Sequence, residues 1–310
     1  MRFLFGKKNA SNYQLVVSIN ATELRFLVLR IKTEQEPELI VNDVEPIKNN
    51  HIDHALNAFN ERYKKLSLEH APVTVVLQPA HYQSTTVERP DVPEQDLAAS
   101  LRFQLDELTD MSPDEMVTDY YDLPLNASGQ DKITAVVASK TLLSQIVEAV
   151  ASQSWQLDSI TVSEVVLKNL FQTTDNACLV LYGLSKSRYV VQIYRAGALV
   201  FTRELRGVRD LSKYSAQEIE LGALEPLATE IQRSMDYYEG QLRQASLRRI
   251  VLAIAGPQRE AMAESLRDLL AADVELFEYP SWMSELCEGD FSDLEALGAS
   301  LSSRVEGTAQ

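Results

Sequence analysis

The segment Leu224–Leu242, LEPLATEIQRSMDYYEGQL, decides how the rest of this chain is organised. Its apolar residues recur at steps of three and four: Leu224, Leu227, Ala228, Ile231, Met235, Tyr238 and Leu242. That spacing predicts an α-helix of about five turns with one continuous apolar stripe. On the polar side, Glu239 and Arg243 are spaced for an ion pair along the helix. We expect the stripe to pack on a sheet that includes the apolar run Arg249–Gly256, which follows it.

The elements around this helix occur twice along the chain. In the second half, three strands precede the helix, at 177–182, 188–194 and 198–205. A strand at 250–255, a helix at 258–270, a strand at 274–277 and a last helix at 293–304 follow it. In the first half, the same order starts with two strands in 13–31 joined by a turn at 20–23, then a strand at 39–41, a helix capped by Asn50 and a strand at 71–77. This duplicated βββαβα order predicts an α/β protein with a two-lobed, actin-like (ribonuclease-H-like) fold.

An extra β-α-β-β-α unit interrupts the first copy. Its predicted elements are an edge strand at 85–88, a helix at 94–108 with a leucine stripe ending at Leu108, strands at 116–123 and 132–139 joined by a turn at 126–129, and a helix at 140–152. We therefore divide the chain into an N-terminal foot (1–12), a first lobe (13–172) with this subdomain inserted at about 83–155, and a second lobe (173–310).

Composition restricts the class of protein. The chain has 310 residues, 45% of them hydrophobic and 24% charged, with a formal net charge of −16. Those fractions are ordinary for a soluble globular protein, and the acidic balance argues against nucleic-acid binding. We find no run of about 18 apolar residues that would predict a membrane span. The start, MRFLFGKK, is basic and apolar: it is either a disordered start or a weak foot on an anionic membrane surface.

Metal-ligating residue types are sparse. Cys178 and Cys287 lie outside any CxxC pattern, which favours free thiols in a reducing compartment. His51-x-x-His54 has a spacing compatible with two ligands on a helix, but no cysteine or HExxH context accompanies it. From the spacing alone we favour a solvated helix start over a metal site.

Several motifs resemble those of the PilM-like type IV pilus assembly proteins, and in particular the form found in MSHA-type pili. The motifs are EIQRSMDYY at 230–238, VPEQDL at 92–97 with Arg102-Phe103-Gln104, FTREL at 201–205 and FLFGKK at 3–8. The resemblance covers most of the chain. It implies an actin-like protein that lies in the cytoplasm at the inner membrane and binds the cytoplasmic tail of a bitopic membrane protein. The assembly ATPase is a further candidate partner, and peripheral membrane contact is implied as well.

The sequence departs from this family where its members bind nucleotide. Relatives carry Asp-Ile-Gly at the first hairpin, where this chain has Ser18-Ile19-Asn20, and the second Asp-Ile-Gly is replaced by Tyr182-Gly183-Leu184. Of the paired glycines that seat adenosine, only Gly256 remains. Phosphate binding needs close backbone approach and a carboxylate that orders the metal. We therefore expect a degenerate cleft, with no catalytic residue, metal or cofactor, formed by Ser18, Asn20, Thr22, Gly183, Ser185 and Gly256.

Two alternatives stay open beside this non-catalytic scaffold. One is an ATPase of the same fold that keeps Mg·ATP and whose ATP state controls partner binding, with Glu23 or Asp158 as its carboxylate. The other is the cytoplasmic module of a type II secretion system, which normally continues into a transmembrane helix, whereas this sequence stops at Gln310. We expect the partner tail to bind as an extended peptide between the first lobe and the inserted subdomain, with Arg89, Arg102 and Gln104 as candidate contacts.

Overall fold

A computed structural model describes residues 11–32, 36–125, 131–171, 176–185, 187–283, 287, 289 and 291–302. Most of the predicted N-terminal foot (1–12) and the predicted turn at 126–129 lie outside these residues. In the part of the chain that is described, no helix has the length and apolar character needed to cross a membrane.

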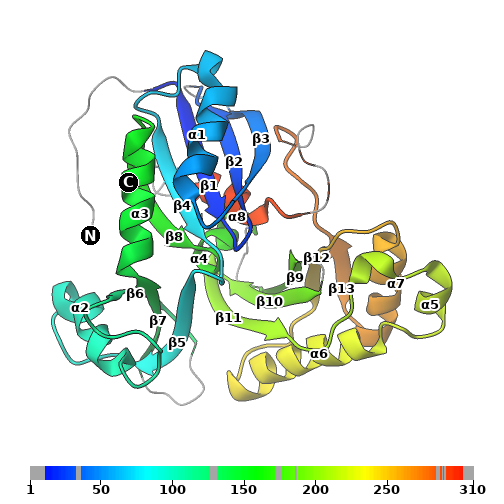
Figure 1. Cartoon of the computed structure of the whole chain (residues 1–310). Coiled ribbons are helices and arrows are strands. Elements are labelled where there is room, and N and C mark those ends of the chain that lie inside the picture. The colour runs from blue at the N-terminus through cyan, green and yellow to red at the C-terminus, as the bar shows by residue number, and fades with distance from the viewer. Residues whose placement is uncertain are drawn as a thin grey trace.

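The first lobe is built on a five-stranded sheet with the order β3-β2-β1-β4-β8 (Figure 1). Its elements are β1 (Tyr13–Ile19), β2 (Glu23–Arg30), β3 (Glu38–Pro46), α1 (Ile52–Arg62), β4 (Pro72–Leu77) and β8 (Gln156–Val162). β1 pairs antiparallel with β2 and parallel with β4. Both faces of β1 are covered: Leu15 and Val17 pack with α1, while Val16 packs on the opposite side. This two-sided burial explains the unbroken apolar sequence of the strand.

The second lobe repeats this plan with the order β11-β10-β9-β12-β13. Its elements are β9 (Cys178–Ser185), β10 (Arg188–Arg195), β11 (Ala198–Leu205), α5 (Ala216–Glu220), α6 (Glu225–Asp236), β12 (Arg249–Ala253), α7 (Arg259–Leu270) and β13 (Asp273–Leu276). β9 pairs antiparallel with β10 and parallel with β12, as β1 does with β2 and β4. The predicted duplication is therefore confirmed.

Helix α6 carries the stripe that the sequence predicts. The seven residues of the stripe, which runs from Leu224 just before α6 to Leu242 just after the following turn, are all 7% exposed or less. They join one cluster with β9, β10, β12 and α7. The predicted helix extends to its expected end, but its last turn, Tyr237–Gln241, is a π-helix. The predicted pairing of Glu239 with Arg243 is wrong, because the Glu239 carboxylate accepts hydrogen bonds from Ser246 and from the Leu247 N–H instead.

The inserted subdomain is a three-stranded sheet with one covering helix. It contains β5 (Tyr82–Glu88), α2 (Glu94–Leu105), β6 (Met116–Asp122) and β7 (Lys132–Ser139), in the strand order β5-β7-β6. Leu97, Leu101 and Leu105 are buried, but Leu108 is 58% exposed because α2 ends before it.

Helix α3 (Lys140–Ser152) packs differently from the prediction that placed it in the insert. Its buried residues Ile146, Ala149 and Val150 join the first-lobe cluster that contains Leu15 and Phe59. The unit that packs separately is therefore β-α-β-β. α3 occupies the place in the first lobe that α7 has in the second, since each helix precedes the last strand of its sheet.

The last helical segment of each lobe packs against the other lobe's sheet. After β8, α4 (Ser163–Val166) leads into Leu167 and Phe171, which pack with Tyr182 and Tyr194 of the second sheet. α8 (Leu294–Ser300) packs on the first sheet beside Val16 and Leu27. The boundary predicted between residues 172 and 173 therefore divides the sequence into two lobes, but segments from each side of it pack against the sheet of the other lobe.

Candidate functional site

The β1–β2 turn, the first predicted phosphate-binding element, is closed by the side chain of Asn20. Its Oδ1 accepts hydrogen bonds from the backbone N–H groups of Thr22 and Glu23, each at 2.8 Å, and the Asn20 N–H donates to the Glu23 carbonyl at 3.1 Å. The Asn20 carbonyl lies 2.8 Å from Nε2 of His81. Backbone N–H groups of the kind that bind phosphate are thus used inside the turn at three of its positions.

Ser18 lies at the end of β1, facing the space between the lobes. It is 2% exposed. Its hydroxyl accepts a hydrogen bond from Nε2 of Gln78, 3.3 Å away, and the same amide nitrogen lies 3.4 Å from a carboxylate oxygen of Glu295 on α8. Where the resembling family carries an aspartate, this chain therefore has a serine. Its hydroxyl belongs to a polar network with Gln78, which follows β4, and Glu295 on α8.

The second lobe presents a phenol at the corresponding place. Tyr182 on β9 is 2% exposed and packs with Leu167, Phe171 and Tyr194. Gly183 pairs with Tyr189, and Ser185 pairs through its backbone with Arg188, across a register shift in the β9–β10 hairpin. Burial raises the pKa of the Tyr182 hydroxyl far above its ordinary range, so this side chain stays neutral and cannot replace an acid that orders a metal.

The buried Glu295 and the half-buried Glu164 lie between the lobes, and the sequence analysis missed both. Burial raises the pKa of Glu295, which is 4% exposed, to about 7, with the charges of Asp293 and Glu164 adding to the effect. Burial also raises the pKa of Glu164, whose carboxylate accepts a hydrogen bond from the Tyr82 hydroxyl. A signal for Glu295 was present in the sequence, since Leu294, Ala296 and Leu297 surround it with apolar residues, as expected for a helix buried on all sides.

Gly256, the remaining glycine of the predicted adenosine site, packs against the protein's own backbone. A Cβ atom built on it would lie 2.9 Å from the Cα of Ser212, and its φ of +131° is unfavourable for other residues. Ser212 belongs to a 3₁₀ turn, Leu211–Lys213, that Asp210 caps. A close approach of two chain segments therefore explains this glycine without a nucleotide.

The two carboxylates considered for an ATPase have other positions. Glu23 starts β2, where its carboxylate lies 3.4 Å from Nδ2 of Asn20 within the turn. Asp158 is exposed and lies at a register shift between β4 and β8, because Val73 pairs with Leu157 and Thr74 with Ser159. Neither residue has the burial expected of a carboxylate that orders a metal in a closed cleft.

A pocket of about 310 Å³ lies between the inserted sheet and the first lobe. Its lining includes residues of β6, β7, β8, α3 and α4, which are Val117, Asp119, Tyr121, Val136, Ala138, Leu143, Ile160, Val162 and Val165, together with Leu77, Tyr120 and Thr161. β6 is an edge strand of the inserted sheet and β8 an edge strand of the first sheet. We call this pocket the β6–β8 groove.

The candidate partner contacts lie elsewhere on the insert. Arg102 and Gln104 are on α2, which packs against Ile133, Ala135 and Val137, the face of β7 opposite to the groove. Arg89 follows β5 and forms ion pairs with Asp122, Asp131 and Glu94. The expectation that these three residues line the groove is therefore wrong, since alternate residues of a strand point to opposite faces.

Comparisons with known proteins agree with the predicted fold. No protein-family model matches the chain, and no curated protein matches it. Solved structures do: the PilM–PilN type IV pilus biogenesis complex gives a TM-score of 0.65 at 16% identity, covering 93% of this chain and 97% of that one. A Bacteroides thetaiotaomicron protein with an actin-like ATPase fold and unknown function gives 0.54 at 10% identity, with 94% and 96% covered.

A third similar structure is the cytoplasmic domain of EpsL, an inner membrane component of the type II secretion system of Vibrio cholerae. It gives a TM-score of 0.51 at 14% identity and covers 94% of this chain and 95% of that chain. Together with the duplicated sheets, these likenesses establish the class: the chain has the actin-like ATPase fold, as its sequence predicts.

Proposed function

We propose that this chain is a non-catalytic adaptor of type IV pilus assembly, of the MSHA type, which binds the cytoplasmic tail of a bitopic inner-membrane protein. The observation that carries the proposal is the β6–β8 groove, where two edge strands border an apolar pocket. Strand edges bind extended peptides through backbone hydrogen bonds, and pockets beside them select alternate side chains.

The chemistry of the groove indicates the kind of peptide. Val117, Val136 and Ile160 provide apolar surface, and Val117 is 42% exposed, although valine is usually buried. Asp119, on the same face of β6, offers a carboxylate to a basic residue. We infer an extended segment with alternating apolar side chains and one Lys or Arg.

The space between the lobes supports a non-catalytic role. Asn20 uses N–H groups of the first hairpin turn, the buried Tyr182 occupies the corresponding region of β9, and Ser212 packs on Gly256. Three separate elements of a nucleotide site are thus occupied by the protein itself. We propose that the protein hydrolyses no ATP and needs no metal or nucleotide to bind its tail peptide.

The similar solved structures fit the proposal. One of them is a PilM–PilN complex in pilus biogenesis, and another is a component of the inner membrane. By analogy, we place this protein in the cytoplasm, peripheral to the inner membrane, with the assembly ATPase as a second partner. The type II secretion module remains the related alternative within the same fold.

The test is a fluorescence-polarisation titration of the full chain with a labelled tail peptide of the bitopic pilus protein. We expect saturable binding and at least a tenfold loss for Val117→Arg, because the bulky charge enters the groove. Phe103→Arg is the matched control: Phe103 is 75% exposed on α2, across the sheet, and its replacement should leave affinity unchanged. Equal affinity for both variants would exclude the groove. Arg102→Glu, in the same series, tests whether α2 also contributes.

A second candidate function is supported by the half-buried Glu164 and the buried Glu295, since an actin-like ATPase needs a carboxylate between its lobes. Calorimetry with Mg·ATP and a phosphate-release assay decide between the two functions. We expect neither saturable binding nor release above background. Micromolar Mg·ATP binding, lost in Glu164→Gln, would establish the ATPase instead.

A further inference from the structure

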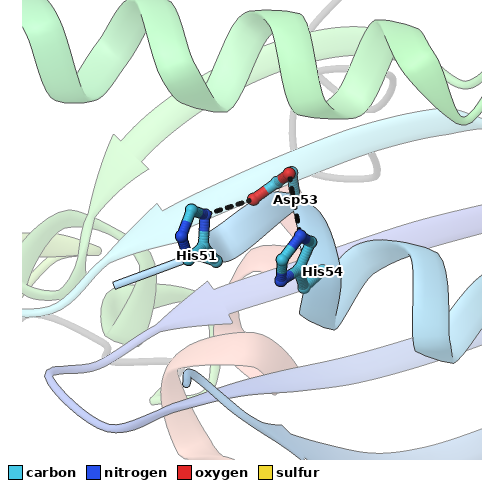
Figure 2. Close-up of side chains that lie close together, drawn as sticks. All are labelled: His51, Asp53 and His54. Atoms are coloured by element: carbon cyan, nitrogen blue, oxygen red, sulfur yellow. Dashed lines mark ion pairs between the residues drawn. The ribbon is translucent and has the colours of Figure 1, made fainter. Parts of the chain in front are cut away.

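Three metal-ligating side chains converge at the start of α1, on the surface of the first lobe. Figure 2 shows the Asp53 carboxylate paired with one nitrogen of each imidazole, and the rings of His51 and His54 are stacked with their centroids 4.5 Å apart. Nδ1 of His51 lies 3.5 Å from one carboxylate oxygen and Nε2 of His54 lies 3.8 Å from the other. The three ligand atoms lie within 4.8 Å of one another. Sequence spacing brought out the two histidines, but only the structure brings the Asp53 carboxylate close to both of them.

The backbone that carries this cluster is fixed by the core. Ile52, Ala55 and Leu56, which alternate with the three ligands along α1, are 7% exposed or less. His51 is the N-cap residue, one position later than the predicted Asn50, and its N–H donates to the Lys48 carbonyl at 3.0 Å. The side chains are accessible, with His51 54%, Asp53 55% and His54 71% exposed. The site therefore combines a rigid backbone with open side chains.

The distances suit a bridging ion better than direct hydrogen bonds. A hydrogen bond from an imidazole nitrogen to a carboxylate oxygen is about 2.7–3.2 Å long, so both gaps are too wide. Ligands about 2.1 Å from a tetrahedral zinc ion lie roughly 3.4 Å from one another. The separations of 3.5 and 3.8 Å are close to that value. The two rings are stacked with their centroids 4.5 Å apart, so one exposed imidazole must turn before both nitrogens point to the same ion.

We propose that His51, Asp53 and His54 form a binding site for a divalent transition-metal ion of the Zn²⁺, Co²⁺ or Ni²⁺ class. Two imidazoles with one carboxylate select these ions over Mg²⁺ and Ca²⁺, which prefer oxygen ligands. The N-terminus of α1 disfavours a cation, and the negative charge of Asp53 in the first turn counters this effect. Three protein ligands leave at least one coordination position for water or for a ligand from another molecule.

The test uses the tag-free full chain and Co²⁺ as an optical probe, with Zn²⁺ as competitor. We expect one Co²⁺ per chain with visible absorption bands, displacement by Zn²⁺ and no displacement by excess Mg²⁺. His51→Ala and His54→Ala should each weaken binding at least tenfold, and the double variant should abolish it. Because both positions are exposed, circular dichroism should show that the variants remain folded.

The chain offers a matched control. It has four histidines, and His70 is exposed and lies outside the cluster. His70→Asn removes an imidazole and suits its φ of +60°, so Co²⁺ affinity should be unchanged. Binding that persists in the double variant, or that His70→Asn weakens equally, would overturn the proposal, as would the absence of saturable binding to the unaltered chain.

Discussion

The two lobes have the same strand order but differ at the two hairpins where the sequence predicts a degenerate cleft. In the first lobe, the turn after β1 is closed by Asn20, and a whole subdomain separates β4 from β8. In the second lobe, β9 carries the buried Tyr182 three residues before its end, and the corresponding connection is α7 alone.

This difference shows which parts of the duplicated plan are held by packing and which are free to change. The sheets and the helices α1, α3, α6 and α7 are held by apolar contacts that each lobe must make. The strand ends and connections carry no such requirement. In this chain, these strand ends and connections form the β6–β8 groove on the first lobe and pack together between the two lobes.

The largest expected effect on stability would come from removing a buried side chain of α1 or of α6, the helices that follow the third strand of each lobe. Phe59 on α1 is fully buried and stacks on Phe26 with ring centroids 3.9 Å apart, and Ile231 on α6 is also fully buried. Phe59→Ala should lower the free energy of unfolding by about 3–5 kcal/mol and Ile231→Ala by about 2–5 kcal/mol. Urea unfolding followed by circular dichroism measures both.

The exposed Asn57 on α1 gives the control for this pair, since Asn57→Ala should change stability by no more than about 0.5 kcal/mol. If one of the two core variants behaved like Asn57→Ala, the helices would not have equivalent roles in the two lobes.

The next effect concerns the space between the lobes and depends on pH. Because the pKa of Glu295 is raised from 4.5 to about 7, the folded state holds a proton that the unfolded state releases. Stability should therefore fall as pH rises from about 4.5 to about 7, by up to about 3 kcal/mol at 1.36 kcal/mol per pH unit. Glu295→Gln removes the ionisable group and should raise the melting temperature at pH 8 more than at pH 5.

Thermal unfolding of both proteins at several pH values checks this prediction. Glu295→Asp is the control, since it keeps an ionisable group at this position. A melting temperature for Glu295→Gln that stays below that of the unaltered chain at pH 8 would contradict the assigned burial cost and would indicate a role that needs the carboxylate.

The smallest effect separates a structural glycine from a nucleotide-binding one. Gly256→Ala should cost about 1–3 kcal/mol, because its Cβ would lie 2.9 Å from the Ser212 Cα at a φ of +131°. Gly240→Ala is the control: nothing lies within 4 Å of its added Cβ, so no loss is expected. Differential scanning fluorimetry compares the two variants. Unchanged stability of Gly256→Ala would contradict the structural role and would favour a ligand-binding role for this glycine.

Much of the fold could be predicted because its signals are local. The α6 stripe, the strand β9 and the helix α3 follow from periodicity within a few turns of chain, and α3 has the predicted ends. α8 shows the limit of this reasoning. The sequence predicted a helix at 293–304, but not that every residue of Leu294–Ser300 is buried or that a Cβ on Gly298 would lie 2.5 Å from the Val166 carbonyl oxygen. That burial depends on α4, more than a hundred residues away in sequence.

The sequence by itself determined the duplicated order of strands and helices and the residues of the two hairpins, Ser18-Ile19-Asn20 and Tyr182-Gly183-Leu184, since these are properties of neighbouring residues. Only the tertiary structure decided where α3, α8 and Arg102 pack, that Glu164 and Glu295 lie close enough for their charges to interact, and that the Asp53 carboxylate approaches two stacked imidazoles. The physical reason is that burial and side-chain convergence depend on which segments fold against each other. Periodicity identifies the buried face of an element, and the partner of that face is fixed when the lobes assemble.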